Sequence, residues 1–401
     1  MSDLPDFEGI RPYRDDEVDA VLKSLLNDQE FLAFLAKFRL HFAYRFLPRL
    51  TRQVVRLALR WQLRKIHDIK GFQLAIAATA KKLVEETMTS FHCEGLELLD
   101  PQQAYLYISN HRDIAGDSML VDYALYCLGR ETVRIAVGDN LVQRQFATDL
   151  MKLNKSFFIR RSEVGAKKIY AALLQSSQYL HESIATNNSV WIAQSEGRAK
   201  DAIDWTDPAV IKMLALAERK KALSEVIREL HIVPVAIAYE FDPCDVLKAR
   251  ALHCIATQGD YQKSPGEDLL SLVKGLAEFK GRVTLRFGRA LDGDFEIPEQ
   301  VAAEIDRQVL DGLQLYPINY WALERLSKMA EGELTDAGLT EYLTVWRQVG
   351  HLFNLKDLKD PAALEHRLTQ CPDEYRREWL QMYANPVVNK VRHGAANLAP
   401  A

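Results

Sequence analysis

Residues 108–117 read Ile-Ser-Asn-His-Arg-Asp-Ile-Ala-Gly-Asp, an apolar run that ends in a histidine with two carboxylates close behind it. The apolar residues 105–108 predict a buried strand, and residues 113–126 predict the helix that follows. His111 therefore lies at a strand-to-helix junction, a common location for catalytic groups. Its imidazole titrates near neutral pH, so it can take a proton from an alcohol when a carboxylate fixes its tautomer. The alternative role for this cluster is to cap the helix.

Two carboxylates compete as the partner of His111. On a regular helix, six positions rotate a side chain by about 240° net, which puts His111 and Asp117 on different faces. If these two pair, the backbone between them is irregular, and Gly116 can absorb the extra position because glycine tolerates positive φ. Asp113 could instead reach the histidine across a tight loop. We favour Asp117 as the partner and Asp113 as the N-cap of the following helix.

The pattern along the rest of the chain predicts an α/β fold, with a central, mostly parallel sheet covered by helices and with helical N- and C-terminal additions. Further strands are predicted over residues 132–138, 156–160, 190–193, 232–238 and 283–287. Helices are predicted over residues 163–185 and 208–230. We expect a helical N-terminal region over 1–100, an α/β domain over 101–295 and a helical C-terminal region over 296–401, the last without a motif that predicts a function.

The amino-acid composition indicates which classes of protein this chain can belong to. The chain has 401 residues, of which 48% are apolar and 26% are charged, so it can bury a large core. A net charge of -4 argues against a general nucleic-acid binder. Five scattered cysteines show no metal-site spacing, which predicts a reducing compartment and no metal site. The acidic, polar start is unlike a signal peptide, and no uncharged apolar run is long enough to span a bilayer. We therefore expect a cytoplasmic protein.

One segment near the N-terminus is strongly basic. Residues 37–70 hold ten Lys or Arg and one acidic residue, a local charge of +9 that leaves -13 for the rest of the chain. Pro48 opens a predicted helix that runs to Lys65. Its arginines share one side, at Arg49, Arg52, Arg56, Arg60 and Arg64. Its apolar residues share the opposite side, at Leu50, Val54, Leu57 and Trp61. Such a helix suits peripheral contact with an anionic membrane surface; the alternative is that its apolar side packs on the catalytic domain.

Three further segments follow residues 108–117 in a characteristic order. The four blocks are Asn110-His111 with Asp117, Phe157–Arg161 (Phe-Phe-Ile-Arg-Arg), Ser195–Arg198 (Ser-Glu-Gly-Arg) and Ile232–Ile237 (Ile-Val-Pro-Val-Ala-Ile). Together they resemble the conserved blocks of the glycerolipid acyltransferases, the family that includes lysophosphatidic acid and glycerol-3-phosphate acyltransferases. Two features depart from that pattern. Five residues instead of four separate His111 from Asp117, and the third block lacks both the usual proline and the hydroxyl residue before Arg198.

The resemblance implies an O-acyltransferase of phospholipid biosynthesis, similar to 1-acylglycerol-3-phosphate acyltransferases. Its donor would be an acyl-CoA or acyl-carrier-protein thioester, with no other cofactor, and its acceptor a glycerol phosphate or a lysophospholipid. The predicted catalytic residues are His111, Asp117 and Asp113. The resemblance assigns acceptor binding to Arg160, Glu196, Gly197 and Arg198, to which we add Asn110 and Arg161 as neighbouring contacts. Two alternatives stay open: a thioester or ester hydrolase acting on lipids, and a non-catalytic lipid-binding relative.

Overall fold

The fold is α/β, as predicted. The computed structural model describes residues 6–139, 144–264, 266–332, 337–354, 358 and 360–401. Its seven strands have the order β1-β7-β6-β2-β5-β3-β4, and most of the paired strands are parallel. The chain divides into two compact units. Unit 1 comprises Met1–Thr79 and Glu131–Val190, and unit 2 comprises Ala80–Arg130 and Trp191–Ala401.

Unit 1 is mainly helical. Its helices are α1 (Asp15–Leu25), α2 (Gln29–Arg39), α3 (His41–Phe46), α4 (Pro48–Leu63), the first part of α5 (Ile69–Thr87), α7 (Gln145–Leu153) and α8 (Ala166–Ala185). Two strands, β3 (Arg134–Gly138) and β4 (Ser156–Ile159), pair in parallel. A core that includes Phe31, Phe72 and Phe146 joins the helices α2, α5 and α7.

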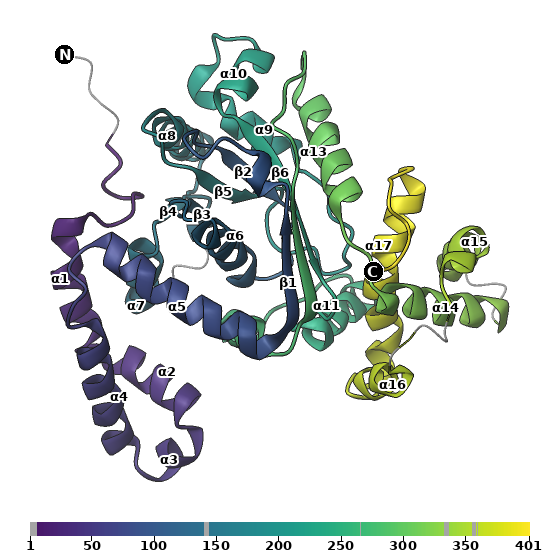
Figure 1. The fold of residues 1–401 in the computed structure, drawn as a ribbon, viewed down its shortest axis with the longest axis horizontal. Helices are drawn as coiled ribbons and strands as arrows, with labels where there is room; N and C mark the ends of the chain where they lie inside the picture. The colour runs from purple at the N-terminus through teal and green to yellow at the C-terminus, as the bar shows by residue number, and fades with distance from the viewer. Residues whose placement is uncertain (1–5, 140–143, 265, 333–336, 355–357, 359) are drawn as a thin grey trace. The chain divides into compact units, whose positions relative to one another are not determined.

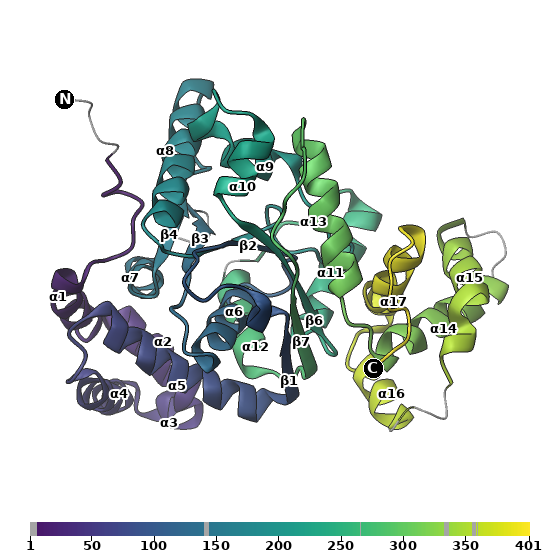
Figure 2. The same ribbon diagram turned by 45° about the horizontal axis from the view of Figure 1, so that its top comes forward.

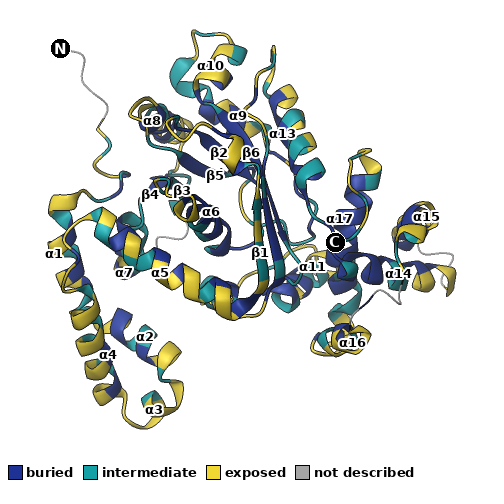
Figure 3. Ribbon diagram, viewed as in Figure 1, coloured by how far each residue is buried: buried dark blue, intermediate teal, exposed yellow. Residues whose placement is uncertain are grey.

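Helices α2, α3 and α4 form a hairpin within unit 1 (Figure 1). Pro48 occupies the first turn of α4, where its missing N–H leaves no hydrogen bond unmade. One side of α4 packs on α2 through Val55, which contacts Leu32 and Ala36. Much of the remaining surface of α4 is exposed (Figure 3). The exposed residues include the whole predicted apolar side, Leu50, Val54, Leu57 and Trp61.

The strands of unit 2 carry the central sheet. They are β1 (Met88–Glu94), β2 (Leu106–Ser109), β6 (Ile232–Tyr239), β7 (Gly281–Phe287) and β5 (Val190–Ala193), which begins at the last residue of unit 1. Strand β1 pairs parallel with β7, β7 pairs antiparallel with β6, and β6 pairs parallel with β2. Strand β1 lies within the first 100 residues, which the sequence predicts to be helical. Strand β1 lies at the edge of the sheet and alternates between buried and exposed residues. Its polar residues therefore interrupt the apolar run by which the buried strands are predicted.

Helices cover both faces of these strands. They are α6 (Gly116–Cys127), α9 (Pro208–Leu214), α10 (Leu223–Glu229), α11 (Asp245–Gln258), α12 (Glu267–Ala277) and α13 (Pro298–Gly312), with short 3₁₀ turns η1 (Leu96–Leu98) and η3 (Leu216–Glu218). Helix α6 lies on one face, where Tyr123 contacts Phe91 of β1, and α13 lies on the other, where Gly312 approaches Ala236 of β6 (Figure 2). The single helix predicted over residues 208–230 is wrong, because the chain turns extended at Ala222 between α9 and α10.

The C-terminal region is helical, as predicted. It contains α14 (Pro317–Gly332), α15 (Ala337–Val349), α16 (Pro361–Thr369) and α17 (Arg376–Arg392), with 3₁₀ turns η4 (Gly350–Leu352) and η6 (Asp373–Tyr375). Their core includes Trp321 and Trp379 and extends to Ala238 of β6 and Ala249 of α11. The C-terminal helices therefore share a core with the sheet. In the described part of the chain, none of the helices has the length and apolar character needed to cross a membrane.

Candidate active site

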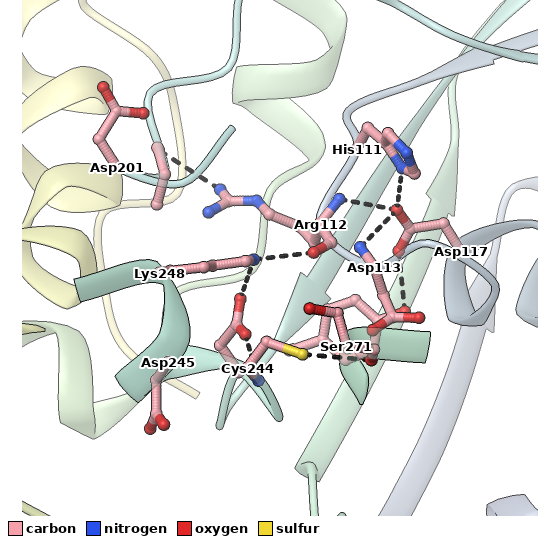
Figure 4. Close-up of polar contacts among 12 residues, drawn as sticks. His111, Arg112, Asp113, Asp117, Asp201, Cys244, Asp245, Lys248 and Ser271 are labelled. Atoms are coloured by element: carbon pink, nitrogen blue, oxygen red, sulfur yellow. Dashed lines mark hydrogen bonds and ion pairs between the residues drawn. The ribbon is translucent and has the colours of Figure 1, made fainter. Parts of the chain in front are cut away.

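His111 and Asp117 form a hydrogen-bonded pair in the loop between β2 and α6. The distance from His111 Nδ1 to Asp117 Oδ2 is 2.8 Å (Figure 4). The side chain of Asp117 is fully buried, whereas 15% of the His111 side chain is exposed. Because Nδ1 is occupied by the carboxylate, Nε2 is the ring nitrogen left to exchange a proton with a substrate. The structure thus pairs the histidine with Asp117 and not with Asp113.

The loop folds back over the first turn of α6 so that this pair can form. Asp117 Oδ2 also accepts hydrogen bonds from the backbone N–H groups of Arg112 at 2.7 Å and Asp113 at 2.9 Å. Gly116 begins the helix, and its φ is not positive, so the loop does not use the conformational freedom that the sequence offers there. Glycine fits there without displacing its neighbours, because a Cβ would lie 2.9 Å from Asp113 Oδ1 and 3.1 Å from Tyr239 Oη.

Asp113 caps the start of α6. Its Oδ1 accepts hydrogen bonds from the backbone N–H groups of Ala115 at 3.1 Å and Gly116 at 2.6 Å. The N-cap position itself is Ala115, so the predicted N-cap residue is wrong by two positions although its capping contact is present. Burial raises the pKa of Asp113, and the nearby Asp117 charge raises it further. This carboxyl group serves the loop and does not contact the imidazole through a hydrogen bond.

The charge of Asp117 is stabilised inside the protein. Burial raises its pKa, but hydrogen bonds and the charge of His111 outweigh burial and bring the pKa below its ordinary value. One of these hydrogen bonds comes from Tyr239 Oη, 2.9 Å from Asp117 Oδ1. Burial and the neighbouring carboxylates raise the pKa of Tyr239 well above its ordinary value, so the phenol remains a donor. An ionised Asp117 favours the tautomer in which His111 carries its proton on Nδ1.

The third sequence block lies next to this pair. The backbone N–H of Gln194 donates to Ser109 O at 2.9 Å, and that of Ala199 donates to His111 O at 3.1 Å. Residues 195–198 therefore form a loop whose two ends are hydrogen-bonded to the strand and the loop that carry His111. Gly197 has a φ of +77°, which explains the glycine in this block. Arg198 Nη1 is buried and lacks a hydrogen-bond partner among the described residues.

Trp191 of β5 also contacts the histidine. Its ring packs edge-on against that of His111, with the ring centroids 5.9 Å apart. Its Nε1 donates to Ser109 Oγ at 3.0 Å, which fixes the indole at the end of β2. The sequence does not predict this contact, because an apolar residue in a buried strand carries no signal of the side chain that it contacts.

Asn110 is placed differently from its predicted role in substrate binding. Its side chain is fully buried, its Oδ1 accepts from the backbone N–H of Ile237 at 2.8 Å, and its Nδ2 donates to Ile237 O at 2.9 Å. The amide thus continues the pairing between β2 and β6 beyond the end of β2. With no exposed surface, Asn110 positions the loop and leaves no group for a substrate.

A buried network of charged side chains contacts the loop between β2 and α6 that carries His111. Arg112 forms an ion pair with Asp204 at 2.6 Å. Lys248 of α11 donates to Arg112 O at 2.8 Å (Figure 4). Lys248 also forms an ion pair with Asp242. Burial raises the pKa of Asp204. None of these partners was predicted, because they lie in segments without a motif and meet only through the fold.

The arginines of the second block, Arg160 and Arg161, belong to unit 1, whereas His111 belongs to unit 2. The Arg160 guanidinium lies against Gly9, where a Cβ would collide with it. The backbone N–H of Arg161 donates to Asp139 Oδ1 at 3.1 Å. Their role in acceptor binding stays a prediction. Over the described part of the chain, no group of three or more His, Cys, Asp or Glu residues is arranged to hold a metal ion.

Comparison with known proteins finds one family model and two solved structures that are similar to parts of the chain. No curated protein matches the chain. The solved structure of the 1-acyl-sn-glycerophosphate (LPA) acyltransferase PlsC from Thermotoga maritima is 13% identical, with a TM-score of 0.39, over 70% of this chain and 95% of that chain. The signal recognition particle 54 kDa protein from Aeropyrum pernix K1 is also 13% identical, with a TM-score of 0.21, over 94% of this chain and 95% of that chain. Both TM-scores are below 0.5, so neither likeness bears on the function.

Residues 90–239 match the family model described as Acyltransferase. This span contains all four sequence blocks, from Asn110 to Ile237, together with the His111–Asp117 pair. Residues 90–239 are therefore similar to the acyltransferase family, in agreement with the resemblance of the four blocks.

Proposed function

We propose that this protein transfers a fatty acyl group from an acyl-CoA or acyl-carrier-protein thioester to the hydroxyl of a glycerol phosphate or lysophospholipid, most closely as a 1-acylglycerol-3-phosphate acyltransferase. The observation that carries the proposal is the 2.8 Å hydrogen bond between His111 and Asp117 inside the acyltransferase match. Such a pair provides a general base on a side chain that is 15% exposed. This reaction would be a step of phospholipid biosynthesis.

The proposed mechanism needs no covalent enzyme intermediate. His111 Nε2 takes the proton of the acceptor hydroxyl as its oxygen attacks the carbonyl carbon of the thioester. We assign the developing oxyanion to backbone N–H groups of the loop at residues 195–198. When the tetrahedral intermediate collapses, the C–S bond breaks and the leaving thiolate takes the proton from Nε2. The products are the ester and the free thiol, and the imidazole returns to its neutral form.

We assign the phosphate of the acceptor to Arg198, with Glu196 and Gly197 shaping the loop. Arginine suits this role because its planar guanidinium binds phosphate oxygens in pairs. The buried and unpartnered Nη1 of Arg198 supports the assignment, since such a donor is left for a bound group or for water. The resemblance of the second block extends the same role to Arg160, with Arg161 beside it.

We further propose that the protein reaches its lipids as a peripheral protein on the cytoplasmic face of a membrane. Trp61 of α4 is 64% exposed and Phe42 of α3 is 78% exposed, so the hairpin presents a large apolar surface to solvent. Other exposed apolar residues of this hairpin are Phe38, Phe46, Leu50, Val54 and Leu57. The membrane-contacting arginines would be Arg49, Arg52, Arg56 and Arg60, which suit anionic headgroups.

Acyl transfer with a panel of acceptors tests the proposal. Purified protein would be incubated with labelled acyl-CoA or acyl-carrier protein and with lysophosphatidic acid, glycerol 3-phosphate, lysophosphatidylcholine or monoacylglycerol, and the lipids would be extracted and separated. We expect labelled product with at least one acceptor that carries a phosphate monoester. Release of free fatty acid at the same rate with and without acceptor would instead identify a hydrolase, in which water replaces the alcohol. No turnover of any thioester would favour a non-catalytic lipid-binding protein.

A further inference from the structure

Tyr239, the last residue of β6, completes the hydrogen bonds of Asp117. Asp117 Oδ2 has three donors, which are His111 Nδ1 and the backbone N–H groups of Arg112 and Asp113. Oδ1 accepts from Tyr239 Oη at 2.9 Å, the one hydrogen bond to this oxygen that the described residues provide. The Asp117 side chain has no exposed surface, so bulk water has no access to replace a lost donor.

Contacts with Asn110 and with strand β7 hold the backbone near Tyr239 in place, and this backbone directs the tyrosine side chain toward Asp117. Asn110 bonds both backbone polar groups of Ile237, two residues before it. Strand β7 pairs with β6 in a register that sets Tyr239 opposite Val283. The absence of a side chain at Gly116 leaves the space that the hydroxyl occupies. Because the surrounding structure preorganises Tyr239, its hydroxyl can donate to the carboxylate without a further loss of side-chain conformational entropy at each turnover.

We propose that Tyr239 is a positioning residue that sets the pH at which the His111–Asp117 pair takes up a proton. The role of that pair as a general base rests on the proposed function. A donor on Oδ1 draws negative charge away from Oδ2 and so weakens the stabilisation of a protonated imidazole. Without that donor the carboxylate is more basic, and the pair keeps its proton to a higher pH, whichever of the two groups carries it.

Several other charged groups near the pair make hydrogen bonds or ion pairs of their own. Asp113 caps α6, Asp242 pairs with Lys248, and Lys248 also donates to Arg112 O. Lys280, just before β7, donates to Glu278 O and Thr87 Oγ1. Burial lowers the pKa of Lys280 to about 8, so this lysine loses its charge only in the alkaline range. The raised pKa of Asp113 also places its titration on the acid side, so the NMR signal of His111 is needed to separate the pair from this neighbour.

The test compares wild-type protein with Tyr239→Phe by the pH dependence of kcat and by NMR titration of labelled histidines, with His111→Ala used to assign the His111 signal. We expect the acid limb and the NMR titration of the pair to move up by about one pH unit, which corresponds to about 1.4 kcal/mol. We expect kcat to fall about tenfold on the acid limb, below both titrations, and to change little on the plateau, with little change in the acceptor KM. Tyr316→Phe is the matched control, because Tyr316 is a buried tyrosine whose hydroxyl bonds Thr284 away from the site.

A second substitution covers the case in which Tyr239→Phe does not fold. A fluorinated tyrosine at position 239 keeps the shape and has a more acidic hydroxyl, so it should move the titration of the pair down. An unchanged titration in a folded Tyr239→Phe protein, or equal effects in the Tyr316→Phe control, would overturn the proposal. Failure of the proposed function is distinguishable, because it would appear as absent acyl transfer in the wild-type protein while the NMR titration still reports the effect of Tyr239.

Discussion

At the scale of single residues, the structure gives the two carboxylates near His111 different roles. Asp117 holds the imidazole, whereas Asp113 accepts hydrogen bonds from the backbone at the start of α6. The sequence predicts the pair because the block spacing keeps the residues close. It does not predict Tyr239 or Trp191, because their contacts depend on strand register and loop path.

Replacement of the two carboxylates should therefore have unequal effects. Asp117→Asn should lower kcat by about 10²-fold or more, since an amide cannot stabilise the imidazolium. Asp113→Asn should lower kcat less than tenfold and change the free energy of unfolding by about 1 kcal/mol or less, because asparagine also accepts from backbone N–H groups. Steady-state rates and chemical denaturation at neutral pH measure both. A larger loss of activity for Asp113→Asn than for Asp117→Asn would contradict the assignment of Asp117 as the partner of His111.

The depressed pKa of Asp117 also predicts a pH dependence of stability. The pKa in the folded protein lies below the unfolded value of about 3.9, so the carboxylate stabilises the fold above that pH. This stabilisation is lost as the pH falls through the folded pKa. The difference in unfolding free energy between wild type and Asp117→Asn should thus be largest near neutral pH and shrink in acid. A difference that grows in acid would contradict the ionised state of Asp117.

At the scale of elements, the sequence predicts buried strands better than exposed ones. Strands β2 and β6 are nearly continuous apolar runs because both are buried, and the predicted bounds differ from the observed ones by one residue. Strand β1 was missed because an edge strand alternates with polar residues. Helix α4 was predicted from its periodicity, but that pattern could not show which side meets the protein. The structure shows Val55 packed inward and Trp61 exposed.

The exposed arginines of α4 lead to a prediction about membrane binding. Replacing the exposed residues Arg49, Arg60 and Arg64 with Gln should weaken binding to anionic vesicles by up to about a hundredfold, at about 1 kcal/mol per arginine. Rising salt should weaken binding of the wild-type protein in the same way. Vesicle co-sedimentation measures both, with exposed Lys81 and Lys82 of α5 changed to Gln as the control. Binding that responds to neither salt nor these arginines would place lipid access elsewhere.

At the scale of the whole molecule, the C-terminal helices are connected to the site through unit 2. Tyr383 of α17 donates to Asp245 at 3.0 Å and accepts from the backbone N–H of Asp242 at 2.9 Å. Asp242 pairs with Lys248, whose other contact is Arg112 O beside His111. The sequence gives no function for residues 296–401, because this support consists of contacts between distant segments and not of a motif.

Breaking this connection should destabilise the protein. Arg367 of α16 bonds Asp245 Oδ2 at 2.9 Å, so Arg367→Ala leaves a buried carboxyl group without its ion-pair partner. We expect a loss of about 2 to 4 kcal/mol in unfolding free energy. Adding Asp245→Asn should restore part of that loss, because it removes the unpaired charge. Equal stability of Arg367→Ala and wild type would show that the ion pair contributes nothing.

The central claim is that His111 acts as the general base, and acyl transfer by His111→Ala tests it most directly. Initial rates with labelled acyl thioester and the preferred acceptor would be compared for wild type, His111→Ala and the control His92→Ala, an exposed histidine on β1. We predict that His111→Ala lowers kcat by about 10²-fold or more, with its melting temperature unchanged and the control fully active. A folded His111→Ala protein with wild-type kcat would contradict the mechanism.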